Sequence, residues 1–401
     1  MKNLLEEGRI LYISSTDVSI GNGPGVNERE FILALYEMIG ERAHFLIPRP
    51  KEKIADLPVD ACTFCMPYKR HPLNYWGHTA SQVKQANKLL SQHEFDLVVV
   101  RLTLFPISSL SITRRNRIPH AIKTLGVGPL NVLDEKGWLF GSSLNKVNQK
   151  MFKYLVSKAV VSDTDSTLHV EALQQKLDVN SNSIVWIDNT VNVNRFFPSP
   201  TRDARKELGL THFDPIIGYI GSRPWERGGM QLIDAAPGLL SKYPDLGVVI
   251  IGDGKELADM KERARVLEVA DRCRFEGYVP FDRIPLYVNS LDLGVSISYR
   301  DDRRVNSELK VRQYLACGKP VVISPGSNEF VVEEDLGSVV QPNDIHAIAT
   351  EIDRWLSLSS DERETFSQRS AGYMRNNLSM EAAVSKRIEL WSERLQSINT
   401  H

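Results

Sequence analysis

The sequence predicts an α/β protein of two doubly wound parallel-sheet domains, followed by a C-terminal helix that packs back across the junction between them. Two observations predict this architecture. Short apolar runs alternate with helical patterns twice along the chain, and a proline-containing segment, residues 198–200, separates the two series. Buried strands that alternate with helices indicate parallel sheets with crossover helices. A chain of 401 residues also suits two domains.

The first domain is expected over residues 1–198. Its strands are expected at Ile10–Ile13, Ala43–Ile47, Leu97–Val100, Ala121–Leu125 and Ala159–Val161. Apolar residues at helical spacing follow the first strand between Phe31 and Ile39, and recur over Ser81–Ser91 and Leu144–Leu155. This alternation predicts a first parallel sheet.

The second domain is expected over residues 199–378. Its strands are expected at Ile216–Ile220, Val248–Ile251, Arg274–Phe275, Leu293–Ile297 and Pro320–Ile323, with a helix near Met230–Lys242. Residues 379–401 are expected to form the C-terminal helix, because Val384, Ile388, Trp391 and Leu395 make one apolar stripe.

Composition narrows the class of protein. The net charge of −1, with 42% hydrophobic and 25% charged residues, fits a globular protein without a nucleic-acid-binding field. No apolar run is long enough to span a membrane. Four cysteines do not make a disulfide scaffold, and the C-x-x-C of Cys62 and Cys65 is interpreted as small apolar residues around a strand rather than as a redox pair or half a zinc site. A cytoplasmic location is expected.

Two glycine-containing loops each follow a predicted strand and precede a helix. In the first, Gly23 and Gly25 precede a helix start, where backbone N–H groups favour an anion; an ordinary strand–helix connection remains the alternative. The second, residues 221–229, carries Arg223 and Arg227 at the carboxyl end of a strand. Arginine pairs well with phosphate, so a phosphate contact is favoured over solvated arginines.

A third segment, residues 306–323, predicts a helix, a glycine stop at Gly318 and a buried strand. Ser307 is the expected N-cap, and Lys310 stands in the first turn. A lysine there is unfavourable against the helix dipole, which indicates a nearby anion. We therefore expect a nucleotide diphosphate to be held at this helix. Gln313, one turn on, is able to bond hydroxyl groups.

Other charged clusters are weaker signals. Asp301 and Asp302 are flanked by arginines and are interpreted as a salt-bridged loop rather than a metal or general-base pair. Basic clusters at residues 69–71 and 114–117 suit an anionic acceptor or a membrane surface as well as plain solvated surface. No metal site is expected.

Several motifs in order resemble the GT-B retaining glycosyltransferases of family 4 (group 1), most strongly across Ile184–Asp344. The segments that carry the resemblance are IDNTVNVNRFFP, IGYIGSRPWERGG, VVIIGDGKELADMKERARVLEVADRCRFEGYVP and SELKVRQYLACGKPVV, the last similar to the pattern SPLKLFEYLAAGKPVV. The first half matches loosely through GPGVNEREF.

The resemblance implies two Rossmann-like domains facing a cleft, an acceptor-binding first domain, and transfer from a nucleotide sugar to a glycan or lipid-linked glycan hydroxyl, with retention and without a metal or cofactor. Arg227 and Lys310 would then neutralise the leaving diphosphate. The other donor-binding positions implied are Gly23, Gly25, Gly221, Ser222, Arg223, Gly252, Gly254, Tyr278, Val279, Asn306, Ser307, Leu309 and Gln313.

The chain departs from the family pattern at four positions. Ser222 replaces the usual arginine of a Gly-Arg pair, with Arg223 adjacent. Val305 and Gln313 stand where the family has two glutamates, and Glu308 replaces a common proline. Two rival functions therefore stay open: a GT-B sugar-nucleotide epimerase, and a non-catalytic nucleotide-sugar binding or partner protein. A role in polysaccharide or glycolipid biosynthesis, with peripheral membrane contact through the first domain, is the expectation for the transferase.

Overall fold

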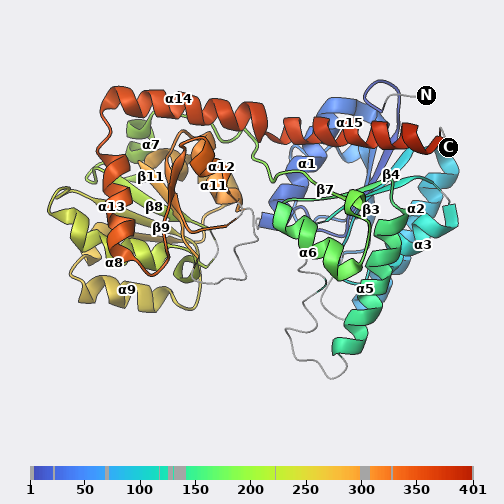
Figure 1. Ribbon diagram of the computed structural model, residues 1–401, viewed down its shortest axis with the longest axis horizontal. Coiled ribbons are helices and arrows are strands. Elements are labelled where there is room, and N and C mark those ends of the chain that lie inside the picture. The colour runs from blue at the N-terminus through green and yellow to red at the C-terminus, as the bar shows by residue number, and fades with distance from the viewer. Residues whose placement is uncertain are drawn as a thin grey trace. The chain divides into compact units, whose positions relative to one another are not determined.

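The computed structural model describes residues 4–20, 23–67, 72–116, 118–124, 130, 141–221, 223–298, 308–326 and 328–399. The chain divides into two compact units (Figure 1): unit 1 comprises Met1–Asp188 and Met380–His401, and unit 2 comprises Asn189–Ser379. The division falls before the expected boundary at residue 198, because Phe196 is buried in the core of unit 2 and the Val191 N–H donates to the Leu378 carbonyl at 3.0 Å.

Unit 1 contains a seven-stranded parallel sheet in the order β3-β2-β1-β4-β5-β6-β7. The strands are β1 Ile10–Ile13, β2 Ala43–Pro48, β3 Cys62–Cys65, β4 Leu97–Arg101, β5 His120–Lys123, β6 Val161–Thr164 and β7 Ile184–Trp186. The helices are α1 Gly23–Ile39, α2 Pro72–Gln92, α3 Ile107–Asn116, α5 Gly141–Lys158, α6 Thr167–Leu177 and α15 Met380–Asn399.

Strand β6 differs from its sequence expectation. The apolar run at Ala159–Val161 overlaps it only at Val161, and the strand itself is Val161–Thr164. Ser162, Asp163 and Thr164 are nevertheless buried. Hydrophobicity alone did not reveal this strand, because polar residues at the carboxyl end of a parallel strand face the edge where such sheets hold polar groups.

The C-terminal helix α15 belongs to unit 1. Val384, Ile388 and Trp391 are fully buried in the same apolar cluster as Phe31 of α1. Arg387, on the same helix, donates from Nε and Nη2 to Asp163 Oδ2 of β6 at 3.1 and 2.9 Å. The predicted apolar stripe of α15 therefore packs into the core of unit 1, and the buried ion pair between Arg387 and Asp163 also holds the helix there.

A buried charge cluster lies beside the carboxyl ends of β4 and β5. Glu28 of α1 accepts hydrogen bonds from Arg101 and, at 2.8 Å, from the Tyr12 hydroxyl, and Lys123 Nζ lies 3.6 Å from its carboxylate. Lys123 Nζ also sits 3.9 Å from the Phe31 ring centroid. Burial lowers the pKa of Lys123 to about 7, although Glu28 partly opposes that shift.

Cys62 and Cys65 occupy the two ends of β3 and form no disulfide. Burial raises the pKa of each thiol to about 12, so neither is a reactive thiolate near neutral pH. This agrees with their interpretation as small apolar residues. Within the described part of the chain, no helix is long and apolar enough to cross a membrane.

Unit 2 contains a six-stranded parallel sheet in the order β10-β9-β8-β11-β12-β13. The strands are β8 Ile216–Ile220, β9 Gly247–Ile251, β10 Cys273–Gly277, β11 Leu293–Ser296, β12 Val321–Ile323 and β13 Gly337–Val339. The helices are α7 Thr201–Leu208, α8 Gly229–Leu240, α9 Leu257–Val266, α10 Ile284–Ser290, α11 Leu309–Ala316, α12 Phe330–Glu333, α13 Ile345–Leu356 and α14 Ser360–Asn377.

The strand order of unit 2 reverses direction between β8 and β11. The chain runs outward from β8 to β10, then returns to β11 and continues to β13. Right-handed crossovers on the two sides of such a switch place helices on opposite faces of the sheet. The switch point lies at the carboxyl ends of β8 and β11, where α/β sheets commonly bind ligands.

The buried lysine of unit 1 makes stability depend on pH. The lysine ammonium keeps its proton up to a pKa of 10.5 in the unfolded chain but only to about 7 in the folded protein, so the unfolded state binds more protons between these values. The free energy of unfolding contributed by Lys123 should rise with pH across this window, by at most about 1.4 kcal/mol per pH unit. As pH rises from 7, the free energy of unfolding measured in urea should therefore increase for the wild type relative to Lys123→Met.

The exposed Lys88 of α2 provides the matched control. Lys88→Met should follow the wild type at every pH, because an exposed lysine keeps similar surroundings in both states. A constant difference between wild type and Lys123→Met over the whole range would contradict a depressed pKa.

Candidate functional site in unit 2

The site is built where three loops meet at the switch point of unit 2. Gly221 follows β8, Gly252 follows β9, and Ser296 ends β11. The Gly221 N–H donates to the Ile251 carbonyl at 2.9 Å, and the Ile297 N–H donates to the Arg227 carbonyl at 3.0 Å. The β8 loop is thus fixed to both neighbouring strand ends, as a rigid binding loop requires.

Two glycines allow the backbones to approach this closely. Gly252 has φ +142°, and a Cβ there would lie 2.0 Å from the Gly221 carbonyl oxygen. Gly221 has φ +144°, and its Cβ would lie 3.2 Å from Lys310 Nζ. Both positions therefore need glycine, one for backbone contact and the other to admit the lysine.

Lys310 is buried in the first turn of α11. Its Nζ donates to the Tyr219 hydroxyl at 2.9 Å and lies 4.2 Å from the centroid of the Tyr219 ring. Tyr219, fully buried in β8, thus places the ammonium beside Gly221. A buried cation attracts an anion strongly.

Arg227 supplies the second cation. Its Nη1 donates to Glu308 Oε1 at 2.9 Å, and its buried Nε has no hydrogen-bond partner among the described residues. Glu308 Oε2 lies 3.7 Å from Lys310 Nζ and accepts a hydrogen bond from the Ser296 hydroxyl. The two cations predicted to act together therefore do lie around one point, which a carboxylate of the chain occupies.

The start of α11 corrects one expectation. The N-cap is Glu308, in an extended conformation without a side-chain cap, and the helix begins at Leu309. Ser307, the expected cap, lies outside the described residues, as do Ser222, Val305, Asn306, Asp301 and Asp302. The reason for the shift is local: the Glu308 side chain turns to the two cations instead of to the helix.

The remaining expected donor residues differ in their surroundings. Arg223, at φ +63°, is exposed and forms an ion pair with Glu226 at 3.5 Å. Tyr278 is 69% exposed, whereas Val279 packs against the core of unit 2. The other three described positions are Gly254 after β9, and Leu309 and Gln313, half-buried on α11.

Gly23 and Gly25 belong to unit 1 and lie in the first turn of α1, not in the preceding loop. A Cβ at Gly25 would lie 2.3 Å from the Ile20 carbonyl oxygen, so local packing already requires glycine. Arg101 donates to the Pro24 carbonyl at 3.3 Å and thereby holds this turn. Their contact with a phosphate remains a prediction.

Sequence reasoning missed three residues of the site: Tyr219, Ser296 and Glu308. Tyr219 and Ser296 are buried in strands and look like ordinary core positions. Glu308 left a signal, because it replaces the proline of the related pattern and stands two residues before Lys310. Among the described residues, no group of three His, Cys, Asp or Glu side chains is placed to hold a metal.

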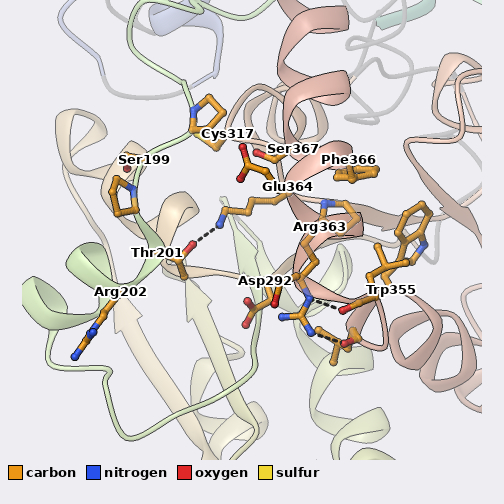
Figure 2. A pocket seen from close by; sticks show the side chains of 18 of the residues that line it. Ser199, Thr201, Arg202, Asp292, Cys317, Trp355, Arg363, Glu364, Phe366 and Ser367 are labelled. Carbon is orange, nitrogen blue, oxygen red and sulfur yellow. Dashed lines mark hydrogen bonds between the residues drawn. The ribbon is translucent and has the colours of Figure 1, made fainter.

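A cavity of about 960 Å³ lies at the opposite, amino edge of the same sheet (Figure 2). Asp292, just before β11, and Thr201 of α7 line it. Within it, Arg205 pairs with Asp292 and Asp214, and Lys319 donates to the Thr201 hydroxyl at 2.8 Å. This cavity is separate from the Arg227–Lys310 site.

The match to a known protein family lies in unit 2. Residues 200–372 match the model of the family described as glycosyl transferases group 1. A GDP-mannose-dependent alpha-(1-6)-phosphatidylinositol monomannoside mannosyltransferase of Mycolicibacterium smegmatis is 30% identical over 169 residues, which are 40% of this chain and 44% of that protein. The chain thus matches less than half the length of this relative.

Two solved structures resemble the whole chain. A glycosyltransferase from Rickettsia africae has a TM-score of 0.75 at 18% identity and covers 98% of this chain and 99% of its own. Anabaena HepE, solved with UDP and glucose, has a TM-score of 0.70 at 17% identity and covers 96% of this chain and 100% of its own. The expected GT-B fold is confirmed.

The contact between the two glycine loops predicts a sharp difference between two substitutions. Gly252→Ala should lower the free energy of unfolding by about 1–3 kcal/mol, because its Cβ cannot avoid the Gly221 carbonyl without a backbone shift. Gly238→Ala, in the exposed part of α8 with nothing within 4 Å, should instead stabilise by about 0.5–1 kcal/mol. Chemical unfolding compares both; equal effects would rule out the close approach.

Proposed function

We propose that the chain is a group 1 glycosyl transferase, the family whose model matches residues 200–372, and that it transfers a sugar from a nucleoside-diphosphate sugar to an acceptor hydroxyl. The relatives support this donor class: the mycobacterial relative is named GDP-mannose-dependent, and HepE was solved with UDP and glucose. Unit 2 is the donor domain in this proposal, and unit 1 carries the acceptor, a glycan or lipid-linked glycan in polysaccharide or glycolipid synthesis.

The observation that carries the proposal is the convergence of Arg227 and Lys310 beside Gly221 and Gly252. Breaking a sugar–phosphate bond builds negative charge on the diphosphate and positive charge on the anomeric carbon. Preorganised cations aimed at that diphosphate stabilise the transition state, typically by about 3 kcal/mol for one good contact. Two side-chain cations supply the charge that a metal supplies elsewhere, so we include metal-independent transfer, with retention, in the proposal.

The two rival functions differ from this one in what they release. A transferase frees the nucleoside diphosphate when an acceptor is present. An epimerase returns a changed nucleotide sugar, and a binding protein returns the same one. Calorimetric titration against a panel of UDP-sugars and GDP-sugars, with chromatography of the products after incubation with candidate acceptors, separates the three outcomes. Binding without any release would contradict the transferase.

Helix α5 is the surface that we assign to membrane contact. It carries no acidic residue and four lysines, of which Lys153 pairs with Asp178 at 2.6 Å. Leu144, Val147 and Tyr154 are exposed at helical spacing on the same helix. Arg114 of α3, from one of the predicted basic clusters, stacks over Tyr154 at 5.3 Å. Exposed apolar residues flanked by lysines favour an anionic lipid surface.

The second predicted basic cluster, residues 69–71, lies outside the described residues. Cytoplasmic location, peripheral at the membrane, completes the proposal. It is supported by four cysteines without a disulfide, which suit a reducing compartment.

Removing either cation should cost activity and not folding. Lys310→Ala and Arg227→Ala should each reduce turnover by about 100-fold or more, because each removes charge aimed at the leaving diphosphate. Nucleoside diphosphate release measures turnover, and circular dichroism checks folding. Arg265→Ala, at an arginine that is 71% exposed on α9, is the control and should retain wild-type rates. Full activity in both site variants would refute the assignment.

The α5 surface predicts binding to anionic vesicles. The protein should co-sediment with vesicles containing phosphatidylglycerol and not with pure phosphatidylcholine, and high salt should release it. Lys146→Glu with Lys150→Glu should weaken this binding by about tenfold or more, since each lysine near the surface contributes about 1 kcal/mol. Lys84→Glu with Lys88→Glu, at exposed lysines of α2, changes the net charge equally and should have a smaller effect. Equal loss in both pairs would refute α5 as the contact.

A further inference from the structure

The carboxylate of Glu308 is held by the same groups that are assigned to the donor diphosphate. Arg227 Nη1 donates to its Oε1 at 2.9 Å, and Lys310 Nζ lies 3.7 Å from its Oε2. The Ser296 hydroxyl donates to that second oxygen. The Glu308 side chain is only 9% exposed. Its two oxygens therefore stand where phosphate oxygens would otherwise meet these cations.

The Glu308 carboxylate reduces the attraction of the site for a negatively charged ligand. Among the described residues, the Glu308 carboxylate cancels one of the two positive charges that Arg227 and Lys310 present. A diphosphate that approaches Arg227 and Lys310 meets the carboxylate within a few ångströms, where like charges repel strongly in a partly buried site. The carboxylate has to leave at least one cation, or its repulsion weakens the complex.

We propose that Glu308 is an internal competitor of the donor diphosphate for Arg227 and Lys310, and that it determines how tightly the site holds phosphate charge. This inference rests on the proposed function. The competition selects by charge: a free nucleoside diphosphate has a terminal phosphate group, with a second pKa of about 6, and so carries about one more negative charge at pH 7 than the nucleotide sugar. Glu308 therefore disfavours the product more than the donor and promotes product release.

The carboxylate at position 308 distinguishes the chain from the related pattern. The related pattern SPLKLFEYLAAGKPVV has proline at the position of Glu308, and proline carries no charge to compete. The lysine that follows two residues later is shared. The substitution thus adds an anion to the site while keeping the cation that binds one.

The test compares ligands that differ only in phosphate charge. Glu308→Gln keeps the size of the side chain and its ability to bond Arg227 and Ser296, but removes the charge. Titration calorimetry gives Kd for nucleoside, monophosphate and diphosphate in the uridine and guanosine series. The variant should bind the nucleoside as the wild type does, the monophosphate more tightly, and the diphosphate about tenfold more tightly or better, which corresponds to about 1.4 kcal/mol.

A second variant and a control guard against a structural artefact. Ser296→Ala removes the hydroxyl that anchors the carboxylate and keeps the charge, so it should also tighten diphosphate binding, by a smaller factor. Glu262→Gln removes a carboxylate that is 55% exposed on α9 and should leave every Kd unchanged. Thermal unfolding confirms that each variant is folded.

The binding measurements distinguish failure of the competitor role of Glu308 from failure of the proposed transferase function. If the wild type binds nucleoside diphosphates and Glu308→Gln binds them equally or more weakly, the competitor role is wrong while the donor site stands. If Glu308→Gln weakens nucleotide-sugar binding without tightening diphosphate binding, Glu308 is a sugar contact and the inference is again overturned. If neither wild type nor variant binds any diphosphate, the proposed function itself fails.

Discussion

The burial of the Lys310 ammonium is the constraint on which the site of unit 2 depends. A charge taken out of water is costly unless other groups compensate it. Here the Tyr219 hydroxyl accepts a hydrogen bond from the ammonium, and the Glu308 carboxylate, which also pairs with Arg227, lies close to it. Gly221 has to lack a side chain to admit the lysine, and Gly252 has to lack one to pass Gly221. The geometry of three loops thus follows from the placement of one cation.

The same principle organises unit 1 at the carboxyl ends of its central strands. Glu28, Arg101 and Lys123 form one buried cluster, and Arg387 pairs with Asp163 nearby. Burial alone would raise the pKa of Glu28, but Arg101 and Lys123 keep it below its usual value. Polar groups collect at this edge because parallel strands end there together, where backbone and side-chain donors converge. Arg387 adds a reason for the C-terminal helix to belong to unit 1, beyond its apolar stripe.

Charge compensation also distinguishes the two polar regions of unit 2. At the amino edge of the sheet, Arg205 is matched by Asp292 and Asp214, although Arg202, Lys319 and Arg363 also line the cavity there. At the carboxyl edge, two cations share one carboxylate. Arg227 and Lys310 lie at the edge where the strand order reverses, and this location supports the proposal that phosphate binds there.

The sequence by itself determined the fold class, most strands of both sheets and the separation into two units, and it singled out Arg227 and Lys310 as candidate phosphate-binding cations. These follow from short-range signals: apolar runs of strand length, helical spacing, glycine after strands and motifs in a specific order. Only the tertiary structure decided that β6 is built of buried polar residues, that Gly25 serves local packing, and that Glu308 sits between the two cations. Each of these depends on which side chains meet across elements distant in sequence, and no local pattern encodes the distance between Arg227 and Glu308, which are 81 residues apart.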